Sequence, residues 1–118
     1  MQEFFGLSTA YYLAKKGKKV IVIDKGLIGE KTSGHTTAKI TLQHGLIYKY
    51  LIDSYGMDFA KGYYEANKQA IANIKKIIDE ENIDCDFEYQ PNLVYIQDKK
   101  EVSKIQDEVE AINSLERK

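Results

Sequence analysis

The stretch MQEFFGLSTAYYLAKKGKKVIVID, residues 1–24, decides the fold that the sequence predicts. Its apolar side chains recur at helical spacing over residues 6–17, and Gly17 stands where a glycine commonly follows the end of a helix. Residues 20–23 are β-branched without polar alternation, which is typical of a strand covered on both faces in a parallel sheet. Asp24 ends that strand. This order of helix, strand and acidic residue predicts the second half of a βαβ unit.

A dinucleotide-binding βαβ unit also needs a first strand and a glycine-rich turn, whose backbone N–H groups approach a pyrophosphate. Gly6 fits the third glycine of that turn, and Asp24 stands where the acidic residue is expected. The first two glycines would occupy positions 1 and 3, but Met1 and Glu3 stand there, and no residues remain for the first strand. The sequence therefore predicts a unit without its phosphate-binding loop.

The rest of the chain is interpreted from periodicity and turn residues. Residues 25–41 have no period and are expected to form a loop. Helices are expected over about 44–55 and 58–81 and again at the C-terminal end, and a hairpin is expected from strands over 86–90 and 93–97. The predicted inner face of the long helix is Phe59, Tyr63, Ala66, Ala70, Ile74 and Ile77, and that of the last helix is Val102, Ile105, Val109, Ile112 and Leu115.

Composition fits one globular domain and argues against several classes of protein. The chain has 118 residues and a formal charge of -1, which disfavours a nucleic-acid binder, and it contains no apolar run or leader typical of a membrane or secreted protein. Cys85 is a single cysteine and cannot form an internal disulfide, so we expect a reducing cytoplasm. His35 and His44 have no cysteine or acidic partner at ligand spacing, so we expect no metal site.

Three stretches resemble one family. GLSTAYYLAKKGKKVIVIDK, residues 6–25, is similar to the first βαβ unit of FAD-dependent oxidoreductases of the D-amino-acid oxidase and glycine oxidase type. The resemblance continues through IGEKTSGHTTAKIT, residues 28–41, and through GYYEANKQAIANIKKIIDEENIDCDFEYQPNLVYIQD, residues 62–98. The GHTTAK run also resembles the subgroup whose full-length members carry a Rieske iron–sulfur domain at the C-terminus.

This resemblance implies an α/β or α+β fold, in which a truncated Rossmann-like FAD-binding unit lacking its first strand is followed by helices and a β-hairpin. Residues 1–43 would be the FAD-binding remnant with its flavin-side loop. Residues 44–118 would begin the substrate domain. Because the similarity covers only the N-terminal quarter to third of an intact member, the sequence looks like a fragment.

The resemblance also implies which residues would contact FAD in the intact parent. Asp24 would hold the adenosine ribose, Lys25 would lie beside the adenine edge, and Gly6 would be the third glycine of the phosphate loop. The flavin-side loop would contribute Ser33, Gly34, Thr36 and Thr37. No catalytic residue is expected in this chain, because in this family those residues lie beyond position 118.

Three functions follow as hypotheses. In the first, the parent oxidises amines or amino acids by hydride transfer to flavin, and this chain alone is inactive and binds FAD weakly or not at all. In the second, the chain is a non-catalytic interaction module stabilised as a homo-oligomer, because a strand at residues 20–23 without neighbours exposes its edges. A small NAD-binding protein is a third hypothesis, disfavoured by the similarity in the loop and in the later strands.

Overall fold

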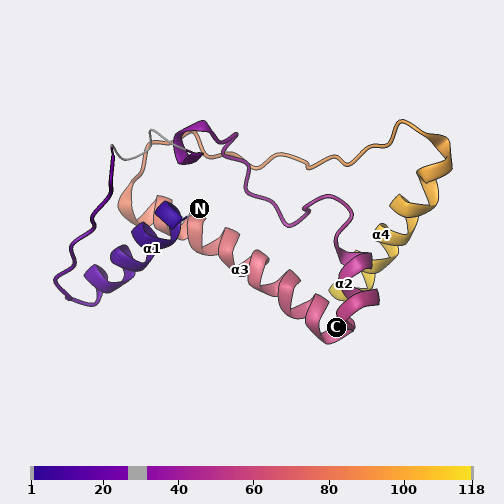
Figure 1. The fold of residues 1–118 in the computed structure, drawn as a ribbon, viewed down its shortest axis with the longest axis horizontal. Helices are drawn as coiled ribbons and strands as arrows, with labels where there is room; N and C mark the ends of the chain where they lie inside the picture. The colour runs from indigo at the N-terminus through magenta and orange to yellow at the C-terminus, as the bar shows by residue number, and fades with distance from the viewer. Residues whose placement is uncertain (1, 27–31, 118) are drawn as a thin grey trace. The chain divides into compact units, whose positions relative to one another are not determined.

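The computed structural model describes residues 2–26 and 32–117, and it divides into two compact units, Met1–Lys39 and Ile40–Lys118 (Figure 1). Each unit is described by itself. The helical elements are α1 (Gln2–Lys15), the 3-10 helix η1 (Thr32–His35), α2 (Tyr48–Tyr55), α3 (Met57–Glu81), the 3-10 helix η2 (Lys99–Glu101) and α4 (Val102–Glu116).

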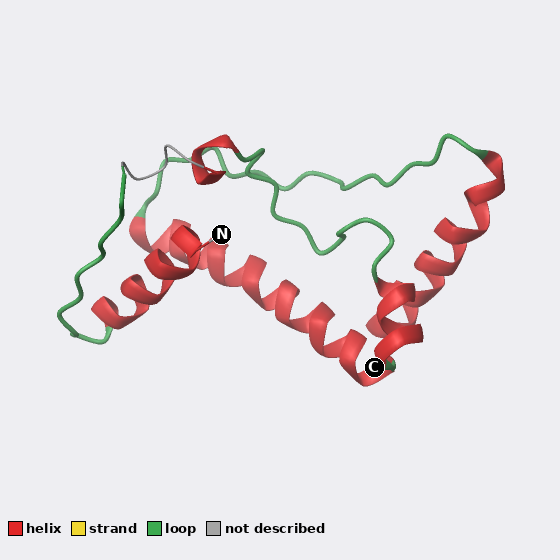
Figure 2. Ribbon diagram, in the orientation of Figure 1, coloured by secondary structure: helices red, strands yellow, loops and turns green. Residues whose placement is uncertain are grey.

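The α/β or α+β fold expected from the sequence is wrong for this structure. Within the described residues every regular element is a helix, so neither a Rossmann-like sheet nor a β-hairpin is present (Figure 2). The segments expected as strands, 20–23, 86–90 and 93–97, have no regular secondary structure. A strand exists only as part of a hydrogen-bonded ladder with a neighbour, and a β-branched run supplies one side of such a ladder and not the other.

The first of these segments nevertheless keeps the side-chain alternation of an extended chain. Ile21 and Ile23 are 87% and 88% exposed, whereas Val20 and Val22 are 37% and 49% exposed. Successive side chains of an extended backbone point to opposite sides, so a difference at every second residue is what an extended segment produces. Residues 20–23 therefore have one bare apolar side and one partly covered side.

Helix α1 ends as the sequence predicts but begins earlier. Gly17 has a φ of 72°, the Gly17 N–H donates to the carbonyl of Ala14 at 2.8 Å, and the Lys18 N–H donates to the carbonyl of Leu13 at 3.1 Å. These two bonds form the Schellman motif, which needs a left-handed residue after the helix and therefore favours glycine. The helix extends back to Gln2, so its start does not coincide with a glycine turn.

The second unit has its core where α2, α3 and α4 pack together. Gly56 separates α2 from α3 with a φ of 87°, close to the predicted stop of the first of these helices. The long helix predicted over 58–81 is confirmed as α3. The buried apolar side chains are Tyr48, Leu51, Ala60, Tyr64, Ala111 and Leu115.

The inner faces predicted for the two later helices are partly wrong. On α3 the buried positions, Ala60 and Tyr64, each lie one residue beyond a predicted position, and Phe59, Ala66 and Ala70 are exposed. On α4, Leu115 is buried as predicted, whereas Val102 and Val109 are exposed. Half-buried positions from the predicted faces are Tyr63, Ile74, Ile77, Ile105 and Ile112. The part of the chain that the structure describes has no helix long and apolar enough to cross a membrane.

Candidate cofactor-binding site

Gly6, the predicted third glycine of a phosphate loop, lies inside α1 and not before it. A Cβ added to Gly6 would meet no atom within 4 Å, so nothing described packs closely against this position. One turn of the helix precedes Gly6, and the N–H groups that could bind an anion belong to the first turn of a helix. The placement expected for Gly6, at the start of the helix, is therefore wrong, because α1 continues through residues 2–5.

Asp24, the predicted ribose ligand, forms a local turn. Its Oδ1 accepts a hydrogen bond from the N–H of Gly26 at 2.8 Å, and both Asp24 and Lys25 are exposed. A carboxylate that accepts from the backbone N–H two residues later forms an Asx-turn, which is an ordinary way to end an extended segment. The exposed carboxylate has the chemistry to accept a hydrogen bond from a ribose hydroxyl, and its role remains a prediction.

The loop expected beside the flavin contains one short helix. Ser33 and Gly34 lie in η1, and Thr37 is an exposed loop residue. The Oγ1 of Thr36 accepts from the N–H of Ala38 at 3.2 Å. Like the bond to Asp24, this bond spans two residues, so it shapes its own turn and does not bring the loop to Asp24. Residues 27–31, part of the stretch expected as this loop, lie outside the described residues.

These residues fit one end of FAD better than the other. The exposed carboxylate of Asp24 suits a ribose hydroxyl. The pyrophosphate would need N–H groups at a helix start beside a glycine, and Gly6 lies a full turn inside α1. The described residues therefore do not form the phosphate cradle of a dinucleotide site.

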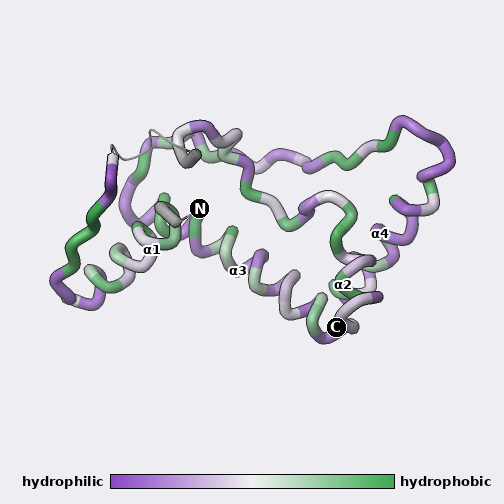
Figure 3. Tube along the Cα trace, viewed as in Figure 1, coloured by the Kyte–Doolittle hydropathy of each residue, from purple (hydrophilic) through white to green (hydrophobic). Residues whose placement is uncertain are grey.

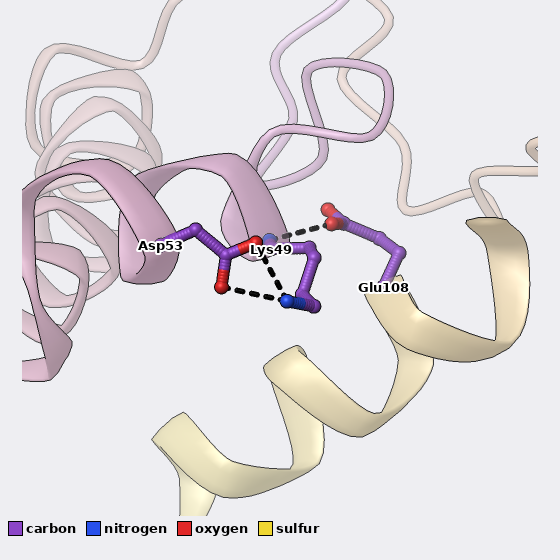
Figure 4. A network of polar contacts seen from close by, with 3 residues as sticks. All are labelled: Lys49, Asp53 and Glu108. Atoms are coloured by element: carbon purple, nitrogen blue, oxygen red, sulfur yellow. Dashed lines mark hydrogen bonds and ion pairs between the residues drawn. The ribbon is translucent and has the colours of Figure 1, made fainter.

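A buried carboxylate in the second unit was not expected from the sequence. Glu108 on α4 is 3% exposed, and its Oε1 accepts from the backbone N–H of Tyr48 at 2.9 Å and from Nε2 of Gln43 at 2.8 Å. Its Oε2 accepts from the backbone N–H of Lys49 at 2.8 Å (Figure 4). Figure 4 also shows the separate pair of Lys49 Nζ with Asp53, 2.6 Å apart on the surface of α2.

Glu108 caps α2 from another helix. Ile47 at the N-cap position has no side chain that can accept a hydrogen bond from the first free N–H groups of α2. The carboxylate of Glu108 supplies that acceptor and places negative charge at the positive end of the helix dipole. An acid at position 108 looks like a solvated residue, yet it lies three residues after Ile105 and seven before Leu115 on the inner side of α4, which is the signal that could have identified it.

Two buried tyrosines of this core, Tyr48 and Tyr64, have their rings in contact and their hydroxyls hydrogen-bonded. The Tyr48 hydroxyl donates to the carbonyl of Leu42 at 2.5 Å, and the Tyr64 hydroxyl donates to Oε1 of Glu116 at 2.8 Å. Burial is the main cause that raises the pKa of Tyr48 from 10.0 to about 12, and it also raises the pKa of Tyr64 to about 12, where the bond to Glu116 contributes as well. Both hydroxyls are thus held neutral and serve packing.

Comparison with known proteins gives the family. The family profile described as FAD dependent oxidoreductase matches residues 4–118. A protein of Bacillus subtilis (strain 168) described as a Rieske 2Fe-2S iron-sulfur protein, YhfW, is 43% identical over 110 residues, which are 93% of this chain and 22% of the relative. A protein of Haemophilus influenzae described as the oxidoreductase OrdL is 36% identical over 86 residues, which are 71% of this chain and 20% of that relative. No solved structure matches the chain.

The chain spans about a fifth of the length of these curated relatives. The family match nevertheless runs through both units, from the residues of α1 to those of α4. It includes the positions of Gly6 and Asp24 and the whole of the loop that the resemblance places beside the flavin. On this evidence the chain belongs to the family of FAD-dependent oxidoreductases.

Proposed function

We propose that this sequence is the N-terminal part of an oxidoreductase that oxidises amines or amino acids, with hydride transfer from substrate to FAD. The observation that carries the proposal is the family match over residues 4–118. Asp24 supports it, because an exposed carboxylate directly after an extended apolar segment has the chemistry to bind a ribose hydroxyl. FAD supplies the hydride acceptor when bound, and this chain contributes binding groups and no catalytic residue.

By itself the chain binds FAD weakly or not at all and is inactive in this proposal. The reason is the position of Gly6 a full turn inside α1, so that within the described residues no glycine turn leads into the start of this helix to receive the pyrophosphate. A diphosphate carries two negative charges, and its desolvation must be offset by N–H donors or cations. One ribose contact at Asp24 is too little to offset that cost.

Flavin titration of the purified chain tests this proposal. We expect a colourless protein and no quenching of FAD fluorescence at micromolar protein. Yellow protein would contradict the expected weak binding, and the variant Asp24→Asn would then decide where FAD binds. If Asp24 is the ribose ligand, Asp24→Asn weakens binding at least about 10-fold, the effect of losing one charge-assisted hydrogen bond. The control Asp84→Asn changes another exposed aspartate and should have no effect.

A second candidate function is supported by a specific observation. The bare side of residues 20–23, formed by Ile21 and Ile23, is exposed apolar surface of the kind that another chain can cover. The chain would then act as a non-catalytic interaction module and exist as a homo-oligomer. We also propose a reducing cytoplasmic setting for both candidates, which suits the free, exposed thiol of Cys85.

A further inference from the structure

Segment 41–45, which leads into α2, is hydrogen-bonded to two parts of the second unit at once. Its odd-numbered residues contact the C-terminal part of the chain. Oγ1 of Thr41 accepts from Nδ2 of Asn92 at 3.2 Å, and Nε2 of Gln43 donates to Oε1 of Glu108 at 2.8 Å. Figure 3 shows hydrophobic and hydrophilic residues following one another along the chain that leads into α2.

The even-numbered residues of this segment contact α2 and α3 instead. Leu42 packs against the buried core, and its carbonyl accepts from the Tyr48 hydroxyl at 2.5 Å. Nδ1 of His44 and the hydroxyl of Tyr63 on α3 are hydrogen-bonded at 2.9 Å. This alternation is that of an extended chain, whose successive residues point to opposite sides. Segment 41–45 therefore joins α2 and α3 on one side to the C-terminal part of the unit on the other.

The side-chain amide of Gln43 connects this segment to α4. Its Nε2 donates both to Glu108 and to the carbonyl of Gly45, so this NH2 group has two acceptors. The carboxylate of Glu108 is 3% exposed and accepts its other two bonds from the backbone N–H groups of Tyr48 and Lys49. A buried carboxylate depends on its donors, and bonds to a charged group are stronger than neutral ones. One carboxylate of α4 thus holds both segment 41–45 and the start of α2.

This segment continues the loop that the family resemblance places beside the flavin. The stretch with that resemblance, residues 28–41, ends at Thr41, four residues after the predicted flavin contact Thr37. Four residues of chain span at most about 14 Å, so the position of Thr41 restricts where the C-terminal end of the flavin-side loop can lie. Whatever fixes segment 41–45 therefore also restricts the end of that loop.

We propose that packing of α4 onto α2 fixes the C-terminal end of the flavin-side loop, and that Gln43 is the positioning residue between them. With α4 in place, Gln43 is held by Glu108 and the end of the loop is fixed. When α4 leaves α2, the segment keeps its contacts to α2 and α3, loses the bond at Gln43, and the end of the loop moves more freely. The proposal rests on the first candidate function, and it names a way in which that site is regulated.

NMR relaxation of the backbone amides in the full chain tests the role of Gln43. Gln43→Met keeps the length of the side chain and removes its donor. Order parameters of residues 40–43 should fall from the rigid range of about 0.85 to below about 0.6. Gln106→Met, at an exposed position of α4, is the matched control and should leave them unchanged. No fall, or a fall confined to residue 43, would overturn the proposal.

Hydrogen exchange tests the same coupling from the other end. Leu115 is 2% exposed and lies two turns beyond Glu108, so Leu115→Ala weakens the packing of α4 without changing segment 41–45. The N–H of Gln43, which donates to Oγ1 of Thr41 at 3.0 Å, should exchange at least about 10-fold faster, together with the α4 amides.

The internal control for this exchange experiment is the N–H of Ala38, which donates to Oγ1 of Thr36 within the first unit and should keep its rate. Faster exchange in α4 with no change at Gln43 would overturn the proposal. If Leu115→Ala does not fold, the relaxation of Gln43→Met decides the question alone.

Neither of these experiments involves flavin, so the coupling can fail while the first candidate function stands. The flavin titration of the wild-type chain reports on that function alone. Light scattering of the same samples measures the oligomeric state and tests the second candidate function separately.

Discussion

Gly6 lies in the second turn of α1, with open space around the place where a side chain would be. In a dinucleotide-binding loop, the glycine at this position is needed so that the helix can lie close to a sheet. Inside an exposed helix it serves no such purpose and costs backbone entropy, by about 0.5–1 kcal/mol relative to alanine. The structure therefore predicts that alanine is favoured at position 6, whereas the family resemblance predicts that glycine is required there.

The variant Gly6→Ala tests which of these two predictions for position 6 is correct. We expect it to stabilise α1 by about 0.5–1 kcal/mol, because alanine is the better helix former and its Cβ meets nothing within 4 Å. The measurement is the helical signal in circular dichroism during thermal unfolding. Ala10→Gly in the same helix is the matched reverse change and should destabilise it. A loss of stability in Gly6→Ala would show that this glycine packs closely against something, as the βαβ prediction requires.

At the scale of the element, the sequence predicted helices well and strands poorly. Helix 58–81 differs from α3 by a single residue at its start, because a long apolar period and a flanking glycine are local signals. Residues 20–23 and 93–97 carry equally clear strand patterns, but a ladder depends on residues far away in the chain. The sequence predicted the residues of the candidate site one by one but not their arrangement. That arrangement depends on a strand ladder, which the described residues do not form.

Glu108 is the element-scale feature that was not expected from the sequence. It links α4 to the start of α2 through two backbone N–H groups, so its effect depends on a contact across 60 residues of sequence. An acid within a helix usually indicates a solvated position, and only the packing of α4 onto α2 turns it into a cap. Its removal should therefore affect both helices together.

Glu108→Gln should lower the free energy of unfolding by about 1–3 kcal/mol, because an amide NH2 group would replace one of the two oxygens that face backbone donors. Urea unfolding followed by circular dichroism measures the change. Glu110→Gln on the same helix is exposed and should alter stability by less than about 0.5 kcal/mol. Equal effects of the two variants would mean that the cap contributes nothing.

At the scale of the whole molecule, the buried tyrosines couple folding to pH. Tyr48 and Tyr64 have pKa values of about 12 in the folded chain and about 10 when unfolded. Between about pH 10 and pH 12, the folded state therefore keeps protons on these two hydroxyls that the unfolded state has lost. The stability from their burial is complete below pH 10 and is lost as the pH rises through 12.

The free energy of unfolding should accordingly fall between about pH 10 and pH 12. Denaturant unfolding at several pH values measures the slope, which should be shallower in Tyr48→Phe because phenylalanine has no proton to lose. Tyr89→Phe removes an exposed hydroxyl and should leave the slope unchanged. If Tyr48→Phe and the wild type have the same slope, the Tyr48 hydroxyl is not held neutral by burial.

The stretch between the end of α3 and η2, residues 82–98, is largely exposed and connects α4 to the helices on which it docks. Helix α4 therefore binds intramolecularly to the surface of α2 and α3, to which it is connected by this stretch. Asn92 in this stretch donates to Oγ1 of Thr41 at 3.2 Å, and a fully flexible tether of the same length would span roughly 20–25 Å on average and give an effective concentration in the millimolar range. A change that raises the dissociation constant of α4 above this effective concentration would release α4 from α2 and α3. The helix would still be covalently connected through residues 82–98. The occupancy of this docking site, and with it the cap on α2, is thus determined jointly by Glu108 and by the length of the tether.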